Sequence, residues 1–577
     1  MILKKINLYI FLAFLSLFSN YKIYCQYNYQ KSNPIDLPLN LSGNFGEIRG
    51  THFHAGIDIK TNGKEGYEIK SIDDGTLTRV SISLGSYGKA IYIKHYDGTT
   101  SVYAHLKKFS KKIEDIIKRF QYNNKTFVLN KFFKENHIII KKNELIGYSG
   151  NTGGSSGPHL HFEIRDSKTQ NVLNPHLFGY KLNDSKEPVI KRIFLYSLNK
   201  FERFENDKIK KNIPFKVISN SKVITDSINY IGKFGIGVET FDQHNLSYNR
   251  NGIYRIELLK NNEIIYNIKF DRFSFNDKKY INYFIDYKEL KENNSKVVKL
   301  FSSENSNLSF LKKEQNGNIT FKENVDYNLE LNIYDFEGNK KNIIIPYKKN
   351  SNYLKQIKFY EKSNINIDEK KTYDFENKKV IFFKNSYLEN QFVSIKNLND
   401  TLVLVNKNYP LNKKIKVSFK IKNELSTNKN IGIGLVLDKS NKIKFLPSII
   451  ENNELYSYSD KLGSFFIAID SDKPTIKPLN FKNGDWVSKK RYLKLEINDL
   501  TSGIKKYDGS INGKWILLEY DPKKKLLTYD LEDLKYDTHK LNLILNVEDL
   551  ANNKSIYKAQ IYRDIGVLEN DLSTSTK

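Results

Sequence analysis

The chain has 577 residues, which at roughly 100–200 residues per domain corresponds to three to five domains. Its formal net charge is +28, but the lysines are scattered among Asn, Ile and Tyr, with no arginine-rich block or aromatic–basic array, so we expect no nucleic-acid partner. The single cysteine, Cys25, excludes a disulfide framework and a cysteine-rich metal site. Any transition-metal site must therefore use His, Asp or Glu.

The N-terminal stretch MILKKINLYIFLAFLSLFSNYKIYCQ is typical of an export signal. Two lysines precede an apolar run over residues 6–18, which is too short to span a bilayer comfortably. Cleavage after Cys25 would make residues 1–25 a signal peptide. Lipidation of Cys25 is an alternative, although the bulky Tyr24 before it is unusual for a lipoprotein, and a retained anchor is a third. No later segment is apolar for long enough to cross a membrane, so we expect an exported protein of the periplasm, cell envelope or medium.

Histidine is concentrated between residues 27 and 183, which contain eight of the ten histidines. The same region alternates apolar and polar residues, as in KAIYIKH (89–95), which predicts β-strands. Between Ser110 and Phe133 the stretch KKIEDIIKRF has apolar residues at helical spacing and predicts a short inserted helix. We therefore expect an antiparallel β-sheet domain over residues 26–183 that carries the chemistry.

Short strands and polar turns continue from about residue 187 to the C-terminus. Alternating stretches such as 491–521, with little helical periodicity, indicate β-sandwich modules. Weak boundaries fall near 347–356 and 471–477, and no clean internal repeat is evident. The expected modules are an immunoglobulin-like one over 187–350, a β-rich one over 351–472 and an immunoglobulin-like one over 473–577. The chain is thus predicted to be mainly β.

The stretch GTHFHAGIDI, residues 50–59, carries His54 and Asp58 four positions apart. On a flat strand this spacing puts both side chains on one face but about 13 Å apart, too far for one ion with bonds near 2 Å. A helix would bring them together, but Gly56 and the flanking isoleucines disfavour one. The remaining solution is an extended segment bent at Gly56.

A second motif, GYSGNTGGSSGPHLHFEI, follows at residues 147–164. Its glycines predict tight turns and HLHFEI predicts a strand, on which His159 and His161 face the same side because they are two residues apart. Glu163 returns to that face. One histidine could ligate a metal while the other reaches a bound water or substrate oxygen. Two neutral imidazoles and one carboxylate with an open fourth position form a catalytic zinc site.

The combined motifs resemble the lysostaphin/LytM family of zinc metallopeptidases, which cleave peptides of bacterial peptidoglycan. The matching elements are HxxxD (His54 and Asp58), YAHL (103–106) and SGNTGxSxGPHLHFEI, in the same order, with Tyr87-Gly88 between them. The resemblance covers about residues 40–180, roughly a quarter of the chain.

The resemblance implies that His54, Asp58 and His161 are the zinc ligands. It also implies that His105 and His159 are the two catalytic histidines, which orient or deprotonate a water and stabilise the oxyanion. Which of these two is the general base stays open.

Several residues near the motifs have weaker assignments. Arg49 is a candidate for binding a substrate carboxylate, and a structural ion pair is its alternative. His52 is expected to be a bystander, and Glu163 is a candidate for contacting the histidines from behind. Asn143 stands where the family usually has Gly, which is tolerable because Asn adopts positive φ. Structural or surface roles are expected for His95, His137, His176, His244 and His539, and core roles for Trp486 and Trp515.

The leading hypothesis is an exported zinc metalloendopeptidase that hydrolyses peptide cross-links of bacterial peptidoglycan. The alternative is a degenerate relative that binds or activates another cell-wall hydrolase. A third treats the long β region as an adhesive or scaffolding unit. Retention of all three ligands and both catalytic histidines favours the enzyme. A D-amino-acid cross-link, a glycine bridge and a non-wall protein all fit as substrates, and protein partners of the later modules are not identified by the sequence.

Overall fold

The computed structural model describes residues 31–564, with gaps at 51, 246, 303–307, 314, 358–361, 407, 422–429, 438–439, 441 and 534–537. The signal peptide predicted over residues 1–25, including Cys25, lies outside the described residues. Within the described part, no helix is both long and apolar enough to cross a membrane. The chain is mainly β, with mostly antiparallel sheets, as predicted.

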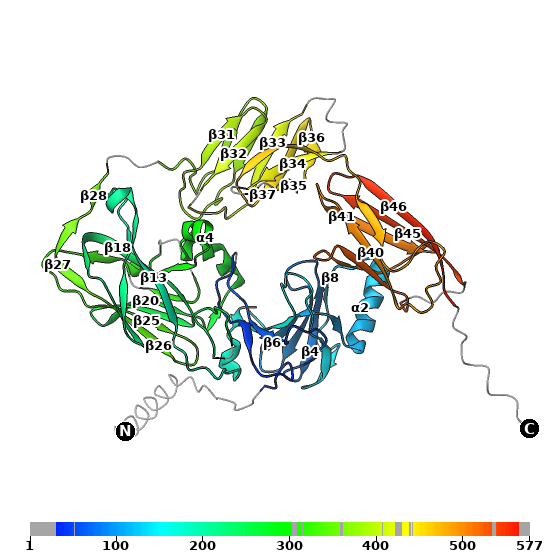
Figure 1. Cartoon of the computed structure of the whole chain (residues 1–577), viewed down its shortest axis with the longest axis horizontal. Coiled ribbons are helices and arrows are strands. Elements are labelled where there is room, and N and C mark those ends of the chain that lie inside the picture. Colours follow the sequence, from blue (N-terminus) through cyan, green and yellow to red (C-terminus); the bar gives the residue numbers. More distant parts are fainter. Residues whose placement is uncertain are drawn as a thin grey trace, which may run out of the picture.

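Four modules follow one another around a ring (Figure 1). We refer to residues 31–183, 187–350, 351–472 and 473–564 as the first to fourth modules. The fourth, in orange and red, returns to lie beside α2 (Lys111–Asn124) of the first. The first and last modules of the described chain are therefore in contact.

The first module is built on an antiparallel sheet with the order β1-β2-β11-β6-β5-β4-β8. Its strands are β1 (Leu41–Gly43), β2 (Ile57–Lys60), β11 (His159–Asp166), β6 (Thr99–Leu106), β5 (Lys89–His95), β4 (Gly75–Ile82) and β8 (Leu129–Phe132). In this register, His161 of β11 lies opposite Asp58 of β2 on one side and Ala104 of β6 on the other. The three motif segments are therefore adjacent strands of one sheet.

The predicted insertion contains the expected helix. Helix α2 turns Ile113 and Ile117 into the core, as its apolar spacing requires. It ends at Lys125, which has a left-handed backbone that satisfies carbonyls of the last turn. The chain then returns as β8, which pairs with β4 and extends the sheet. The insertion thus adds one helix and one edge strand to the module.

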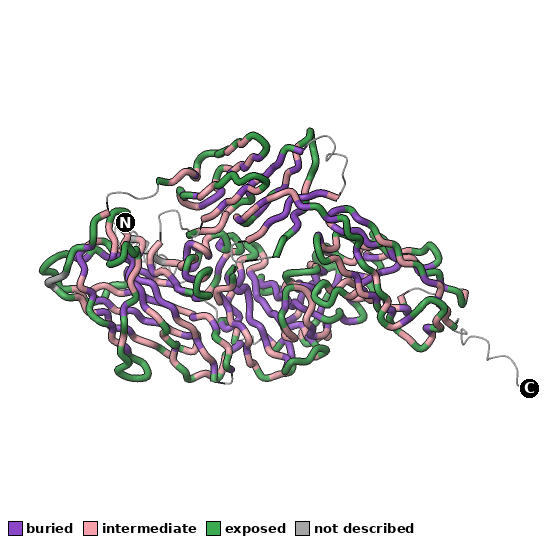
Figure 2. Tube along the Cα trace, turned by 45° about the horizontal axis from the view of Figure 1, so that its top comes forward, coloured by how far each residue is buried: buried purple, intermediate pink, exposed green. Residues whose placement is uncertain are grey.

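The second module shares a hydrophobic core with the first. Phe53 of the first module lies 5.0 Å from Phe310, 5.6 Å from Phe284 and 5.8 Å from Phe273, measured between ring centroids. Buried side chains form one continuous cluster from Ile35 to Leu354, and buried segments run across both modules in Figure 2. The boundary predicted at 183–187 falls in the connecting segment, but the packing continues across it.

The second module's main strands and helix form around that core. They are β13 (Val189–Ser197), β18 (Ile228–Phe241), β19 (Arg255–Lys260), β20 (Glu263–Lys269), α4 (Tyr287–Asn293), β25 (Leu329–Tyr334) and β26 (Lys340–Ile345).

The third and fourth modules are each two packed sheets around a core of their own. The third contains β30 (Lys378–Phe382), β33 (Ile415–Lys420) and β37 (Glu454–Ser459) in one sheet, and β32 (Thr401–Val405), β34 (Ile431–Val436) and β38 (Ser464–Ile469) in the other. The fourth contains β39 (Thr475–Pro478), β40 (Tyr492–Asn498), β43 (Leu518–Asp521) and β44 (Leu526–Asp530) facing β41 (Ile504–Ile511), β42 (Lys514–Trp515), β45 (Lys540–Asp549) and β46 (Lys554–Tyr562). Both are sandwiches; that they are specifically immunoglobulin-like stays a prediction.

Neither tryptophan has the core position expected from the sequence. Trp486 is 58% exposed and stacks on Tyr562 at the surface of the fourth module. Trp515 meets Tyr122 of α2 edge-on, with ring centroids 5.4 Å apart, and so belongs to the contact between the fourth and first modules.

Charged pairs complete this contact between the fourth and first modules. The buried Lys89 Nζ of β5 lies 2.9 Å from a carboxylate oxygen of Glu519 in β43, and Lys118 of α2 is bonded to Asp533. Burial alone would lower the pKa of Lys89, but the Glu519 and Glu114 carboxylates raise it above its ordinary value. The Lys89 ammonium therefore depends on a partner some 430 positions away in the chain.

Replacing Glu519 by Gln should weaken the contact between the fourth and first modules, because it leaves the buried Lys89 ammonium without its nearest carboxylate. We expect a loss of about 1–3 kcal/mol, seen as a lower thermal unfolding midpoint by calorimetry. The matched control is Glu532→Gln, which breaks an exposed pair with Arg563 in the same module and should cost much less. Equal midpoints for the two variants would contradict the inferred role of Lys89.

Candidate metal centre

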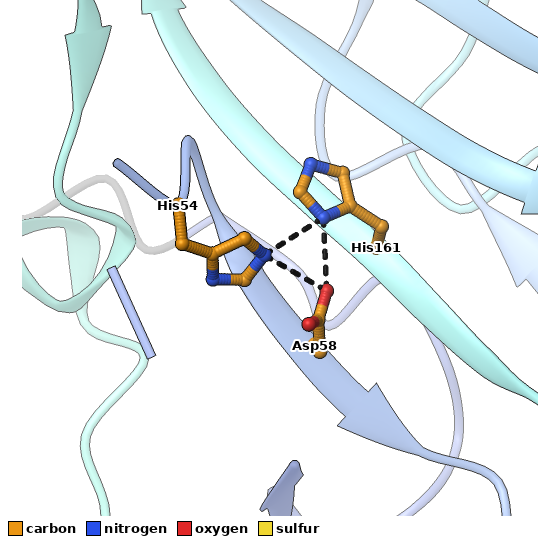
Figure 3. A group of neighbouring side chains, drawn as sticks. All are labelled: His54, Asp58 and His161. Atoms are coloured by element: carbon orange, nitrogen blue, oxygen red, sulfur yellow. Dashed lines mark hydrogen bonds and ion pairs between the residues drawn. The ribbon is translucent and has the colours of Figure 1, made fainter. Parts of the chain in front are cut away.

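Three side chains from two distant segments converge beside the paired strands β2 and β11 of the central sheet (Figure 3). His54 Nε2 lies 3.0 Å from Asp58 Oδ1 and 3.1 Å from His161 Nδ1, and the last two atoms are 2.9 Å apart. All three residues are buried. The donor atoms thus form a nearly equilateral triangle.

The convergence of His54 and Asp58 depends on a bend at Gly56. His54 lies in the loop before β2, Asp58 lies in β2, and Gly56 is the bend between them. A Cβ at Gly56 would lie 2.2 Å from the Phe162 carbonyl oxygen of β11. Glycine is therefore required here by the close approach of two backbones. The bend shortens the distance that a flat strand would impose.

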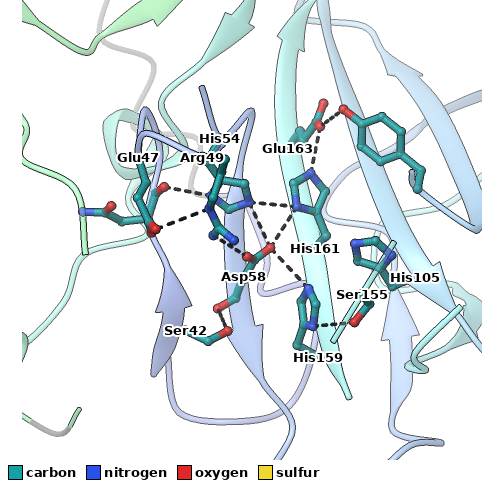
Figure 4. Close-up of polar contacts among 12 residues, drawn as sticks. Ser42, Glu47, Arg49, His54, Asp58, His105, Ser155, His159, His161 and Glu163 are labelled. Atoms are coloured by element: carbon teal, nitrogen blue, oxygen red, sulfur yellow. Dashed lines mark hydrogen bonds and ion pairs between the residues drawn. The ribbon is translucent and has the colours of Figure 1, made fainter. Parts of the chain in front are cut away.

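Each of the three residues has its other polar atom held by a neighbour (Figure 4). The His54 Nδ1 lies 2.8 Å from the Asn44 carbonyl oxygen, to which it can only donate. The His161 Nε2 lies 2.8 Å from Glu163 Oε1, and Arg49 donates to Asp58 Oδ2 over 3.0 Å. These contacts leave one lone-pair atom of each residue facing the common centre.

The donor set fits a zinc-class ion. Ligands around a tetrahedral ion with bonds of about 2.0 Å are about 3.3 Å apart. The three donor atoms here are separated by 2.9–3.1 Å, so small adjustments suffice. Two imidazoles and one carboxylate are the ligand types of catalytic zinc sites, which keep a further position open.

A buried charged network supports His161 from behind. Glu163 is fully buried and accepts hydrogen bonds from Arg165 over 2.6 Å and from Tyr87 Oη over 2.5 Å, as well as from His161. Burial alone would raise the pKa of Glu163, but Arg165 and His161 lower it to about 2. The ionised Glu163 therefore orients the His161 ring and favours the tautomer with its lone pair on Nδ1.

His105 and His159 lie beside the centre with matching orientations. His105 Nδ1 donates to the Thr152 carbonyl over 2.8 Å, and His159 Nδ1 donates to the Gly157 carbonyl over 2.8 Å. Each ring therefore presents an unprotonated Nε2, and His159 Nε2 lies 3.4 Å from Asp58 Oδ1. The ring centroids of the two histidines are 4.9 Å apart. Two proton acceptors thus face one side of the centre.

The environment keeps His105 neutral. Burial, together with the nearby His161 and His159, lowers the pKa of His105 to about 3. Its backbone has φ of 59°, a left-handed value that is uncommon for a residue other than glycine. This local strain places the imidazole against the sheet edge, where a neutral ring can accept a proton or a hydrogen bond.

The residues with weaker assignments take different positions. Arg49 pairs with Asp58, and its Nε lies 3.3 Å from Glu47 Oε1. Arg49 also lines the cavity, so a structural ion pair and a contact with a substrate carboxylate both remain consistent with its position. His52 is exposed at the cavity wall and outside the triangle. Asn143 has φ of 64°, as its replacement of glycine predicts.

The remaining histidines lie away from the triangle. His95 is buried and lies 2.7 Å from Ser101 Oγ, and His137 and His539 are exposed. His176 is buried against Phe336. His244 is buried and paired with Asp242, a partner that the sequence analysis did not assign to it.

Two features of the site were not predicted from the sequence. A cavity of about 1580 Å³ extends from His54, Asp58 and His161 to residues of the second and third modules, including Lys278 and Lys461. In addition, Lys523 of the fourth module donates to the carbonyl of Ser155 over 3.0 Å and to that of Asn151. Ser155 Oγ lies 3.2 Å from His159 Nδ1. No local sequence signal marks these contacts, because their partners are hundreds of residues apart.

The chain is similar to known peptidases over part of its length. The model of Peptidase family M23 matches residues 52–122 and 122–175. The DD-carboxypeptidase/endopeptidase Mpg of Neisseria meningitidis serogroup B is 33% identical over 112 residues, which are 19% of this chain and 20% of that protein. An uncharacterized metalloprotease of Haemophilus influenzae is 28% identical over 159 residues, 27% of this chain and 28% of that protein.

A solved structure of the catalytic domain of the antimicrobial peptidase lysostaphin from Staphylococcus simulans is 25% identical and covers 26% of this chain and 92% of that domain, with a TM-score of 0.17. The chain spans between a fifth and somewhat more than a quarter of the length of the curated relatives named here. The matched residues include the three converging side chains and both neighbouring histidines. On the family match, residues 52–175 of the first module form a peptidase family M23 domain.

Proposed function

We propose that the chain is an exported zinc-dependent metalloendopeptidase that hydrolyses peptide cross-links of bacterial peptidoglycan. The observation that carries the proposal is the triangle of His54 Nε2, Asp58 Oδ1 and His161 Nδ1, whose sides are 2.9–3.1 Å. The same three residues are the ligands implied by the resemblance to the lysostaphin/LytM family. The relative in Neisseria meningitidis is named a DD-carboxypeptidase/endopeptidase, which supports peptide-bond hydrolysis as the reaction.

His54, Asp58 and His161 would hold the zinc ion, which supplies a Lewis acid that polarises the scissile carbonyl and acidifies water. His159 and His105 each turn an unprotonated Nε2 toward the site. Either can take a proton from the attacking water, and the other can then bind the developing oxyanion once it is protonated. Glu163 holds the His161 ring in one orientation while these proton transfers take place.

The cavity suits an extended and anionic substrate. Its walls come from three modules, and its charged lining outside the ligand triangle is predominantly cationic. The cationic residues are Arg49, Lys60, Lys278, Lys279, Lys291 and Lys461, and the anionic ones are Glu292 and Asp460. A cleft of one dominant sign attracts ligands of the opposite charge. Wall peptides carry free carboxylates, which fits this lining.

The alternative function, a regulator that binds another cell-wall hydrolase, has less support. Such a role does not require metal ligands or proton acceptors, yet all five residues are retained here and are brought together. The buried Glu163–Arg165 pair behind His161 is a costly arrangement for a site with no ion to orient.

Separate losses are expected for the ligand and catalytic histidines. His161→Ala should lose its zinc and should no longer release muropeptides from purified sacculi. The released muropeptides are measured by mass spectrometry. His105→Ala should retain one zinc per chain while its activity falls by about 10²–10⁴-fold, because one proton-transfer group is lost. His137→Ala, at an exposed histidine of the same module, is the control and should match the wild type.

Fully zinc-loaded protein that releases no muropeptide would favour the regulator. Activity that persists after complete removal of zinc by a chelator would contradict the metallopeptidase.

Changing the support of His161 should weaken zinc binding without removing a ligand. Glu163→Gln is expected to lower zinc affinity by about 10–100-fold, measured by competition with a chromophoric chelator. Tyr87→Phe removes one hydrogen bond to the same carboxylate and should have a smaller effect in the same direction. Glu135→Gln, at an exposed site paired with Lys94, is the control. Unchanged affinity in both Glu163→Gln and Tyr87→Phe would refute the positioning role.

The fourth module is expected to affect catalysis through Lys523, which holds the loop before His159. Lys523→Ala removes the donor that holds the Asn151 and Ser155 carbonyls, so the loop before His159 loosens. We expect kcat/KM on sacculi to fall by about tenfold with the zinc content unchanged. Lys524→Ala is a matched control, because that neighbour pairs within its own module with Asp521. Equal activity of the two variants would show that the module contact does not act on catalysis.

A further inference from the structure

The second and fourth modules repeat one arrangement of strands. In the second, β13 pairs with β18, β19 with β20, β19 with β25, and β25 with β26. In the fourth, β39 pairs with β40, β41 with β42, β41 with β45, and β45 with β46. All eight pairings are antiparallel. Corresponding positions of the two modules can therefore be compared directly.

Two short sequences recur at corresponding places. In the second module, the linker and the start of the first strand have the sequence DSKEPVIKRI (184–193). In the fourth module, the linker and the first strand have the sequence DSDKPTIKPL (470–479). NIYDFEGNK (332–340) turns between β25 and β26, and NVEDLANNK (546–554) turns between β45 and β46. The repeat is too diverged to stand out in the sequence, but the strand pairing reveals it.

Each module brings three aspartates together at the junction with the module before it. The linker aspartates are Asp184 and Asp470, the strand-end aspartates are Asp242 and Asp499, and the turn aspartates are Asp335 and Asp549. In both modules an asparagine amide joins the linker carbonyl to the turn carboxylate. These bonds run from Asn339 to Asp184 and Asp335, and from Asn553 to Asp470 and Asp549.

The two junctions differ after the strand-end aspartate. Asp499 is followed four residues later by Gly503, whereas Asp242 is followed ten residues later by Gly252. The longer loop is closed by two backbone hydrogen bonds of 3.0 and 2.8 Å between Asp242 and Asn251, so these two residues are cross-strand partners. The loop carries His244, whose Nε2 lies 3.2 Å from Asp242 Oδ2.

Two buried oxygens at this junction have no hydrogen-bond partner. They are Asp242 Oδ1 and Asn251 Oδ1, on residues that are 1% and 2% exposed. A buried carboxylate or amide oxygen left unpaired costs about 1–3 kcal/mol, and more when the group is charged. At the fourth-module junction, both oxygens of Asp470 and both of Asp549 accept hydrogen bonds. The unpaired oxygens are therefore specific to the junction that contains a histidine.

Negative charge also accumulates at the second-module junction. Asp335 is buried close to the Asp242 carboxylate and accepts hydrogen bonds from Asn339. A lysine ammonium, that of Lys186, donates to the His244 backbone carbonyl. A cation would supply positive charge among the carboxylates and would also satisfy the orphaned oxygens.

The geometry points to a second metal site, in which Asp184, Asp242 and His244 bind a divalent transition-metal ion of the zinc class at the joint between the first and second modules. Their donor atoms lie within 4.8 Å of one another. The fourth ligand in this proposal is the unpaired Oδ1 of Asn251, which is the cross-strand partner of Asp242. One imidazole among oxygen donors favours zinc or manganese over calcium, which takes oxygen ligands.

An ion at this joint would fasten the connecting segment to the second module. Asp184 lies in the segment that leaves the first module, and its Oδ1 already accepts a hydrogen bond of 3.0 Å from the Asn245 backbone of the loop. The ion would add bonds between the same two elements. Because the two modules share one core, the joint also steadies the cavity wall contributed by the second module.

Zinc stoichiometry on the full-length chain tests the site. Chelator-stripped protein is titrated with Zn²⁺ and washed, and the metal is counted by mass spectrometry. The wild type should retain two zinc ions per chain, whereas Asp58→Asn, which damages the peptidase centre, and Asp242→Asn should each retain one. The matched control is Asp499→Asn, the equivalent change at the histidine-free junction, which should retain two.

A second readout separates this site from the peptidase centre and from misfolding. In the Asp58→Asn background, Zn²⁺ should raise the thermal unfolding midpoint, and adding His244→Leu should remove that increase while a cooperative transition remains. The site is overturned if Asp242→Asn and Asp499→Asn retain equal numbers of zinc ions, or if Zn²⁺ stabilises both backgrounds equally. Because Asp58→Asn has lost its peptidase centre, these outcomes do not depend on the proposed function.

Discussion

The antiparallel pairing of β2 with β11 is the constraint on which the peptidase site depends. A slip of one residue along β11 would turn every side chain to the other face of the sheet. It would withdraw His159, His161 and Glu163 together and bring Leu160 and Phe162 into the site. Leu160 and Phe162 are fully buried in the core on the opposite face, so the packing that stabilises the module also maintains the register of the polar residues.

The polar residues behind the triangle fix the orientation of its three side chains. The Asn44 carbonyl and the carboxylate of Glu163 each occupy the ring nitrogen that does not face the centre, and Arg49 occupies the second oxygen of Asp58. The donor atoms are thereby preorganised before any ion arrives, which lowers the conformational cost of binding. His105 and His159 are fixed in the same way by backbone carbonyls.

The later modules are part of the site rather than an independent tail. The second module shares the core of the first, the third lines the far wall of the cavity, and the fourth reaches back to the loop before His159 through Lys523. The ring also contains an internal duplication. Its two copies differ at one loop, where the second module has His244 and an unpaired buried oxygen of Asp242 and the fourth module has a short turn from Asp499 to Gly503.

The sequence alone determined the features that depend on short-range periodicity and residue chemistry. Alternation identified the β character, helical spacing identified α2, and the two-residue separation placed His159 and His161 on one face. It also identified which residue types could bind a metal, and the bend at Gly56 as the condition for His54 and Asp58 to meet. These inferences succeed because strand and helix geometry act over a few residues.

Only the tertiary structure decided the contacts between distant parts of the chain. Lys89 with Glu519, the shared core around Phe53 and the pairing of His244 with Asp242 beside Asp184 depend on how whole modules dock. The exposed position of Trp486, expected in a core, has the same origin. Docking is set by the fit of complete surfaces, so no local window of sequence encodes it, whereas the residues of the candidate metal centre lie in two motifs that one sheet brings together.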